Sequence, residues 1–185
     1  MCVAMKTGQQ SRIMISVLGI SHQVQGVTKG TFQKISDPSY RQYIQTEIDS
    51  RRFDFVFEEA SGLGPTTAEE VSLRILGKGH YLDVDPSLDT RPQFGIPGLC
   101  ETCTSIHPSE SRVADRVRHE VMEVQDKREQ LWVDRVKGQS FTSALFICGY
   151  LHTLSLAFRL QSADFFIQQA SSYVPHHKLC TLPHA

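Results

Sequence analysis

The sequence lacks the segments that would place it in a membrane or direct it to export. Residues 1–10 are mostly polar and contain no apolar signal-peptide stretch, and no apolar run approaches the length of a bilayer span. The 19 Lys and Arg against 20 Asp and Glu leave a formal net charge of −1, so the basic surface typical of nucleic-acid and membrane-surface binders is missing as well. We therefore expect a cytoplasmic globular protein with no nucleic-acid partner and no membrane partner.

Fingerprints of several enzyme classes are also missing. The chain contains no Gly-x-Ser-x-Gly elbow, no P-loop and no Gly-x-Gly-x-x-Gly motif, which argues against a serine hydrolase and a nucleotide-binding fold. The 5 cysteines are scattered and odd in number, so we expect reduced thiols rather than a disulfide framework. One Cys-x-x-Cys pair leaves a structural zinc or a redox pair as alternatives. The zinc ligands would be Cys100, Cys103 and His107, with Cys180, His176 or His177 as the fourth.

What is present is the pattern of one α/β domain. With 185 residues the chain is long enough for a substantial core. Five short apolar runs are continuous rather than alternating, as in strands of a buried parallel sheet, and helical patterns lie between them. We predict a three-layer sandwich with a mainly parallel central sheet of about five strands, over residues 12–170, between a flexible segment 1–11 and a tail 171–185. The predicted strands are Ile13–Leu18, Phe53–Phe57, Tyr81–Val84, Ala144–Cys148 and Phe165–Ile167.

Capping residues set the boundaries of the first predicted helices. Asp37 before a proline can start one helix, Thr67 and Glu70 have the spacing of a capping box, and Gly77 can end that second helix. The stretch 89–108 has little periodicity and several prolines, so we expect a long irregular loop there.

A longer helix is predicted from Ser109 to Gly138. Its apolar stripe passes through Val124 and Leu131, and Arg128 lies between them, near the centre of the stripe. An arginine at that place is directed toward the interior, where an unpaired guanidinium is costly. Arg128 therefore predicts a buried acidic partner, and the alternative is a side chain that snorkels to the edge of the core.

Two predicted strands end in the same motif. Gly19-x-x-His22 follows the first strand and Gly149-x-x-His152 follows the fourth, so both imidazoles are expected at the carboxyl edge of the sheet, where open α/β sheets bind ligands. Together they can share a metal, or one can act as an acid or base, although each histidine alone is as readily structural. Cys148 is a candidate nucleophile with His152 nearby, but a cysteine that ends an apolar strand is more often a buried small residue.

Acidic residues end the second and third predicted strands. Glu58 and Glu59 follow one apolar run directly, and because adjacent strand residues point opposite ways they are not expected to do the same job. We predict that Glu58 partners Arg128 or a metal. Glu59, Asp83 and Asp85 are assigned to substrate binding, with a solvated strand end and an Asp-Pro turn as the alternative for the two aspartates.

The ordered set of Gly-x-x-His, strand-end Glu, helix-borne Arg and second Gly-x-x-His resembles the TraB/Tiki superfamily, which also takes in erythromycin esterase-like and ChaN-like proteins. The resemblance covers the framework from Ile13 to Leu160. It implies an α/β fold and, in several branches, divalent-metal-dependent hydrolysis, whereas other members bind haem. It maps four residues onto active-site positions, namely His22, Glu58, Arg128 and His152.

Three functional hypotheses follow. The first is a metal-dependent hydrolase in which His22, Glu58 and His152 hold a divalent ion of unknown identity, with Glu58, Arg128 and His152 as the catalytic set. The second is a non-catalytic ligand- or haem-binding protein, and the third is an accessory protein whose site has lost activity. Whether the substrate is a small molecule or a peptide, and whether the protein is a homo-oligomer, the sequence leaves open.

Overall fold

The structure is a computed structural model that describes residues 12–25, 37–62, 65–87, 89–96 and 111–174, apart from the side chains of residues 22–23 and 111–121. Its centre is a five-stranded sheet in the order β3-β2-β4-β1-β5, in which all neighbouring strands are parallel. The predicted parallel α/β fold is confirmed, and each strand overlaps a predicted one. The strands are β1 (Met14–Ile20), β2 (Phe55–Glu58), β3 (Tyr81–Asp83), β4 (Ser143–Gly149) and β5 (Phe166–Ser172).

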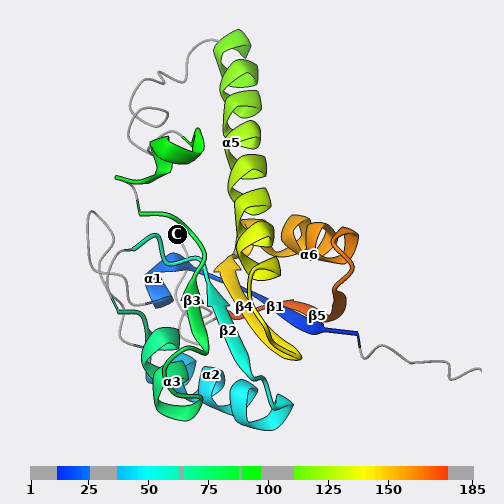
Figure 1. The fold of residues 1–185 in the computed structure, drawn as a ribbon. Coiled ribbons are helices and arrows are strands. Elements are labelled where there is room, and N and C mark those ends of the chain that lie inside the picture. Colours follow the sequence, from blue (N-terminus) through cyan, green and yellow to red (C-terminus); the bar gives the residue numbers. More distant parts are fainter. Residues whose placement is uncertain (1–11, 26–36, 63–64, 88, 97–110, 175–185) are drawn as a thin grey trace, which may run out of the picture.

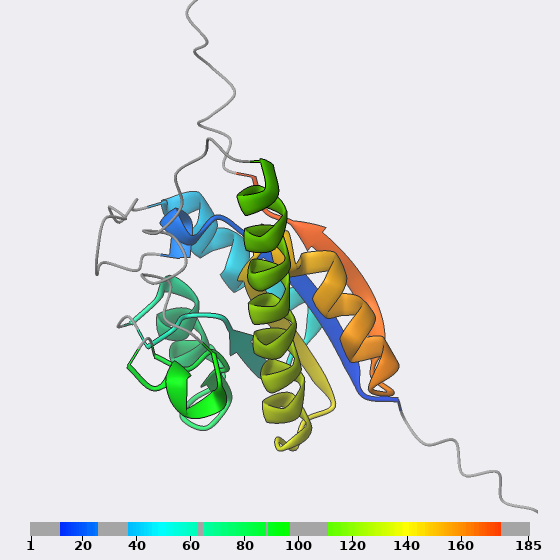
Figure 2. The ribbon, with the colours of Figure 1, turned by 90° about the horizontal axis from the view of Figure 1, so that it is seen from above.

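Helices cover both faces of this sheet and complete three layers (Figure 1, Figure 2). The helices α2 (Pro38–Arg51) and α3 (Thr67–Ile75) bury their apolar side chains against one face. The helices α5 (Ser111–Lys137) and α6 (Thr153–Ser162) do the same on the other face. In Figure 1 the first half of α5 rises past the end of the sheet. Within the described ranges, no helix combines the length and apolar character that a membrane span requires.

Alternate residues of β2 enter the two cores. Phe55 and Phe57 join the core under α5 and α6, whereas Val56 joins the core under α2 and α3. Because side chains alternate along a strand, Glu58 and Glu59, at the end of β2, are directed to opposite layers. This alternation decides which of the two carboxylates can meet α5.

One predicted helix cap is wrong by a single residue. The N-cap of α3 is Thr66, not Thr67, and its Oγ1 accepts a hydrogen bond of 3.0 Å from the backbone N–H of Glu69. Thr66 has extended backbone angles, as an N-cap residue does, so Thr67 already belongs to the first turn. At its other end α3 stops at Ile75 with Leu76 as the C-cap, and Gly77 follows with a positive φ of 88°, so Gly77 ends this helix as predicted.

The other predicted boundaries have mixed outcomes. Asp37 caps α2 as predicted, through two backbone N–H groups of the first turn. The helix α5 ends directly before Gly138, as predicted, while the predicted cap Ser109 lies outside the described residues. The predicted irregular loop contains a short 3-10 helix, η1 (Arg91–Phe94), and residues 97–108 of it are not described. The strand β5 continues two residues into the predicted tail.

Two short helical turns begin where β1 and β4 end. They are α1 (His22–Gln25) and η2 (Tyr150–His152), so both Gly-x-x-His motifs lie at the carboxyl edge of the sheet. The first glycine is needed for close packing between them. A Cβ on Gly19 would lie 2.0 Å from Oγ1 of Thr153 and 3.0 Å from Cα of Tyr150. The two motifs are therefore packed against each other through Gly19.

Candidate active site

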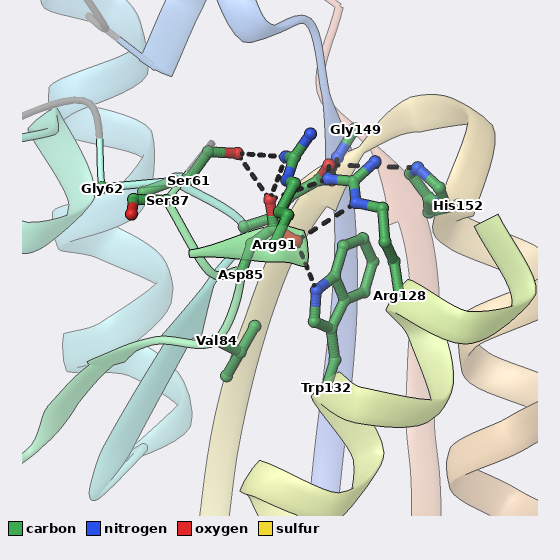
Figure 3. Close-up of polar contacts among 12 residues, drawn as sticks. Ser61, Gly62, Val84, Asp85, Ser87, Arg91, Arg128, Trp132, Gly149 and His152 are labelled. Atoms are coloured by element: carbon green, nitrogen blue, oxygen red, sulfur yellow. Dashed lines mark hydrogen bonds and ion pairs between the residues drawn. The ribbon is translucent and has the colours of Figure 1, made fainter. Parts of the chain in front are cut away.

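Charged groups gather at the carboxyl ends of β2, β3 and β4, on the face that α5 covers (Figure 3). Glu59 follows β2, Asp85 follows β3, and His152 closes the turn after β4. Arg128 and Trp132, one turn apart on α5, reach down to them. We refer to these five residues together as the strand-end cluster.

Arg128 is buried and paired with acids, as its place in the helix stripe predicts. Its Nη2 donates hydrogen bonds to Glu59 at 2.5 Å and to Asp85 at 2.9 Å, and its Nε donates to Asp85 at 3.1 Å. The prediction that Glu58 is the partner is wrong. Glu58 points into the opposite layer because of the strand alternation, so the carboxylate one residue later meets the helix instead.

Asp85 accepts hydrogen bonds from several groups besides Arg128. These are the indole N–H of Trp132 at 2.9 Å, Nη2 of Arg91 at 2.5 Å and the hydroxyl of Ser61 at 2.5 Å. Burial alone would raise the pKa of Asp85, but the charges and hydrogen bonds of Arg128 and Arg91 outweigh it and lower this pKa to about 2. Asp85 is thus an ionised structural anchor for two guanidinium groups.

Glu59 connects the arginine to the second Gly-x-x-His motif. Its carboxylate accepts the backbone N–H of Gly149 at 2.8 Å, and its Oε1 lies 3.9 Å from Nε2 of His152. Only 2% of Glu59 is exposed, so these contacts are made away from bulk water. Glu59 therefore fixes the turn that presents His152 at the sheet edge.

His152 itself is oriented by a second carboxylate from α5. Its Nδ1 lies 2.7 Å from Oε1 of Glu129, and its ring packs edge-on against Trp132 with the centroids 5.0 Å apart. Glu129 also accepts hydrogen bonds from Ser155 and Arg159. Burial would raise the pKa of Glu129, but the hydrogen bonds from His152 and Ser155 lower it overall. An ionised carboxylate can only accept, so Nδ1 carries the proton and Nε2 keeps its lone pair in the neutral ring.

Glu58 belongs to a separate polar group in the layer of α2 and α3. It accepts hydrogen bonds from Gln25 at 3.1 Å, from Thr66 at 2.5 Å and from Tyr81 at 2.8 Å. Burial raises the pKa of Glu58 to about 7 despite these three donors. Gln25 also donates to the backbone carbonyl of Glu59 at 3.0 Å, so this group connects α1 to the end of β2.

Asp83 shapes a turn instead of facing the cluster. Its two carboxylate oxygens accept the backbone N–H groups of Ala60, Gly62 and Asp85, at 3.0, 2.7 and 3.0 Å. Burial raises the pKa of Asp83, and those three hydrogen bonds oppose the rise. Of the residues assigned to substrate binding, Glu59 and Asp85 therefore lie in the cluster, while Asp83 holds the backbone next to it. Their role toward a substrate stays a prediction.

The remaining sequence candidates have different outcomes. The backbone of His22 opens α1 at the sheet edge, but its side chain lies outside the described residues. Burial raises the pKa of the Cys148 thiol well above its ordinary value, which disfavours the thiolate that a nucleophile needs. The predicted zinc or redox residues, Cys100, Cys103, His107, His176, His177 and Cys180, are not among the described residues.

The predicted metal ligands do not fit a shared ion where they are described. Glu58 and His152 lie in opposite layers of the sandwich, and Glu58 already accepts three hydrogen bonds. Among the described residues, no three His, Cys, Asp or Glu side chains form a group able to hold a metal ion. The carboxylate nearest to His152 on the sheet, Glu59, carries the guanidinium of Arg128, which disfavours a dication at that place.

The sequence patterns did not lead us to predict a role for two residues of this region, Glu129 and Arg91. Glu129 stands at i, i+3, i+4 and i+7 spacing with Trp132, Val133 and Val136, all of them buried, and that stripe was a usable signal. Arg91 lies in a segment without periodicity, and only the fold brings it to Asp85, so no sequence signal pointed to it.

No family model, curated protein or solved structure matches the chain. The likeness to the TraB/Tiki superfamily therefore stays a prediction from the motifs.

Proposed function

We propose that the protein is a hydrolase in which His152 acts as the general base and general acid. The observation that carries the proposal is the 2.7 Å contact between Nδ1 of His152 and the buried carboxylate of Glu129. It leaves Nε2 as the basic nitrogen, and Nε2 makes no hydrogen bond to a described residue. A histidine held by a carboxylate at the carboxyl edge of a parallel sheet is a common arrangement for acid–base catalysis.

The proposed reaction uses only residues of this chain. Nε2 of His152 takes a proton from a water molecule, and the resulting hydroxide adds to the carbonyl carbon of an ester or amide. The imidazolium then returns the proton to the leaving group, and the carbon–leaving-group bond breaks. Glu129 stabilises the imidazolium, while Arg128 positions Glu59 and through it the turn that carries His152. The predicted divalent ion takes no part, because the described ligand candidates do not fit it.

A second candidate is a ligand- or haem-binding protein without turnover. The observation that favours it is the low exposure of the strand-end cluster: 2% for Asp85, 7% for Arg128 and 5% for His152. A cluster so enclosed is also what a purely structural ion-pair network looks like. In this case His152 would contact a ligand or remain a core residue.

Catalysis is tested with the purified chain, a panel of p-nitrophenyl esters and anilides, and His152→Gln and Glu129→Gln variants. We expect His152→Gln to lower kcat/KM by roughly 10²–10⁴-fold and Glu129→Gln to lower it in the same direction. His80→Gln is the matched control, because His80 is exposed and contacts the carbonyl of Asp54 and the ring of Phe55, at the amino end of the strands and away from the cluster. Circular dichroism checks that each variant folds.

The outcomes separate the candidates. Hydrolysis that persists in His152→Gln contradicts the proposed base. Hydrolysis that is lost with EDTA and restored by a divalent cation indicates a metal-dependent reaction instead. Absence of hydrolysis together with a Soret band on haem addition, lost in His152→Gln, supports the binding protein. We also propose a cytoplasmic location, which rests on the scattered cysteines and which fluorescence microscopy of a tagged chain tests.

A further inference from the structure

One side of the molecule ends in a sheet edge that no described strand covers. The strand β5 is the last strand of the sheet and pairs only with β1 among the described strands. Its sequence, Phe-Ile-Gln-Gln-Ala-Ser-Ser, has seven residues and contains no charge and no proline. Natural proteins protect such edges with charged residues, proline, bulges or a covering segment, because the unpaired backbone groups of an edge accept another strand. Of these devices, β5 has a register shift opposite Ile15 and Ser16 but no charge and no proline.

The helix beside this edge exposes large apolar side chains. In η2 and α6, Tyr150 is 61% exposed, Leu151 70%, Leu154 78% and Phe158 71%. The other exposed residues of α6 are Ser155, Gln161 and Ser162, and the one charged residue of the helix, Arg159, is partly buried and paired with Asp126 and Glu129. Leucine and phenylalanine side chains exposed to this extent on one helix are typical of an interaction surface.

The two features form one continuous surface. The helix α6 packs on β5 and β1, through Leu156 and Leu160 in the same core as Phe165, and Figure 2 shows it beside β5. The side of α6 that is turned away from the sheet edge contacts α5, through the hydrogen bonds of Ser155 and Arg159 with Glu129. On the helical wheel this places Leu154 on the side that faces the sheet edge, with Phe158 at the top.

We propose that two copies of this chain form a two-fold dimer through β5 and α6. A two-fold axis normal to the sheet makes the two β5 strands antiparallel neighbours and keeps both α6 helices on one face. With strands about 4.8 Å apart and α6 above the gap between β1 and β5, the two helix axes lie about 10 Å apart. That distance matches the 8–10 Å at which helices pack.

A second copy is the occupant that this surface fits. An uncharged apolar strip and an uncharged strand require no complementary charge, so each half of the surface can serve as its own partner. One symmetry operation pairs the strand edges and covers the apolar helix face at the same time. A segment that only added a strand to β5 would satisfy the backbone groups of the edge without covering Leu151, Leu154 and Phe158.

The proposal is tested by sedimentation velocity and light scattering on the full chain between about 1 and 200 µM. We expect a dimer at the upper concentrations, and we expect Leu154→Glu to raise the dimer Kd at least about tenfold, since it places like charges at the seam. Leu73→Glu is the matched control, because Leu73 is 42% exposed on α3, on the far face of the sheet. That variant should dimerise like the unaltered chain.

Amide hydrogen exchange over residues 166–172 tests the dimer independently, whether or not Leu154→Glu folds. Protection of the β5 amides from exchange that rises with protein concentration supports the dimer. A monomer at all concentrations overturns the proposal, and so does a β5 that is equally protected at every concentration, since a segment of the same chain would then cover the edge. A dimer that Leu154→Glu, folded by circular dichroism, leaves intact also overturns it.

Discussion

Replacing Asp85 by asparagine should strongly destabilise the fold. The side chain of Asp85 is fully buried and balances, together with Glu59, the charges of Arg91 and Arg128. Asparagine keeps the shape but removes one negative charge, so the group of four buried side chains Glu59, Asp85, Arg91 and Arg128 changes from neutral to a net charge of about +1. An uncompensated buried charge is among the costliest single substitutions.

Two estimates bound the magnitude. The pKa of Asp85 lies at about 2 instead of 3.8, which corresponds to roughly 2.5 kcal/mol at about 1.4 kcal/mol per pKa unit. Removal of one partner from a buried ion pair costs about 3–5 kcal/mol. We therefore expect Asp85→Asn to lower the free energy of unfolding by roughly 2.5–5 kcal/mol. The difference from the unaltered protein should be full above pH 4 and should shrink as the pH falls toward 2, because the folded-state pKa is the lower one.

Urea denaturation followed by tryptophan fluorescence measures this directly. The chain has one tryptophan, Trp132, and its indole donates to Asp85, so the emission reports on the cluster itself. Asp126→Asn is the matched control, since Asp126 is 64% exposed in its ion pair with Arg159 and should contribute less than about 1 kcal/mol. If Asp85→Asn is no more costly than this control, the cluster is not a buried charge network, and the reasoning is refuted.

Two further stability predictions follow from the same region. The pKa of Glu58 is about 7 in the folded state against an ordinary 4.5, so the unfolding free energy should fall by up to roughly 3 kcal/mol as the pH rises from 4.5 to 7. Glu58→Gln should flatten that part of the pH profile, and an unchanged profile in urea titrations would contradict the burial of this carboxyl. Gly19→Ala should cost roughly 1–3 kcal/mol, because its Cβ would lie 2.0 Å from Oγ1 of Thr153. Gly138→Ala, whose nearest contact would be an ordinary 3.4 Å, is the control, and equal thermal stability of the two variants would count against the close packing of the two motifs.

The sequence predicted the sheet because four of its strands coincide with apolar runs between helical patterns, whereas β5 begins in the predicted run at Phe166 and continues into five residues, Gln-Gln-Ala-Ser-Ser, that the pattern did not include. It also predicted a buried acid for Arg128, since the helix stripe directs this side chain inward whatever lies opposite. It could not choose between Glu58 and Glu59. Alternation says that two adjacent carboxylates diverge, but which of them meets α5 depends on the order of the layers, and that order is a property of the tertiary fold.

The other omissions have similar causes. Arg91 reaches Asp85 from a 3-10 helix that lies in a segment without a hydrophobic pattern, so local sequence carries no information about that contact. The burial of Glu129 could have been predicted from the sequence, since it shares a face of α5 with Trp132 and Val136. An acid inside an apolar stripe and next to an arginine indicates a second buried polar contact, and here that contact is His152.

The most direct test of the proposed site is the tautomer of His152. Long-range ¹H–¹⁵N correlation spectra of the labelled protein distinguish a ring protonated on Nδ1 from one protonated on Nε2, and His152→Gln assigns the signal. The contact with Glu129 predicts a neutral ring with its proton on Nδ1 and its lone pair on Nε2, a pattern that Glu129→Gln should disturb. A ring protonated on Nε2 would contradict the assignment of His152 as the base.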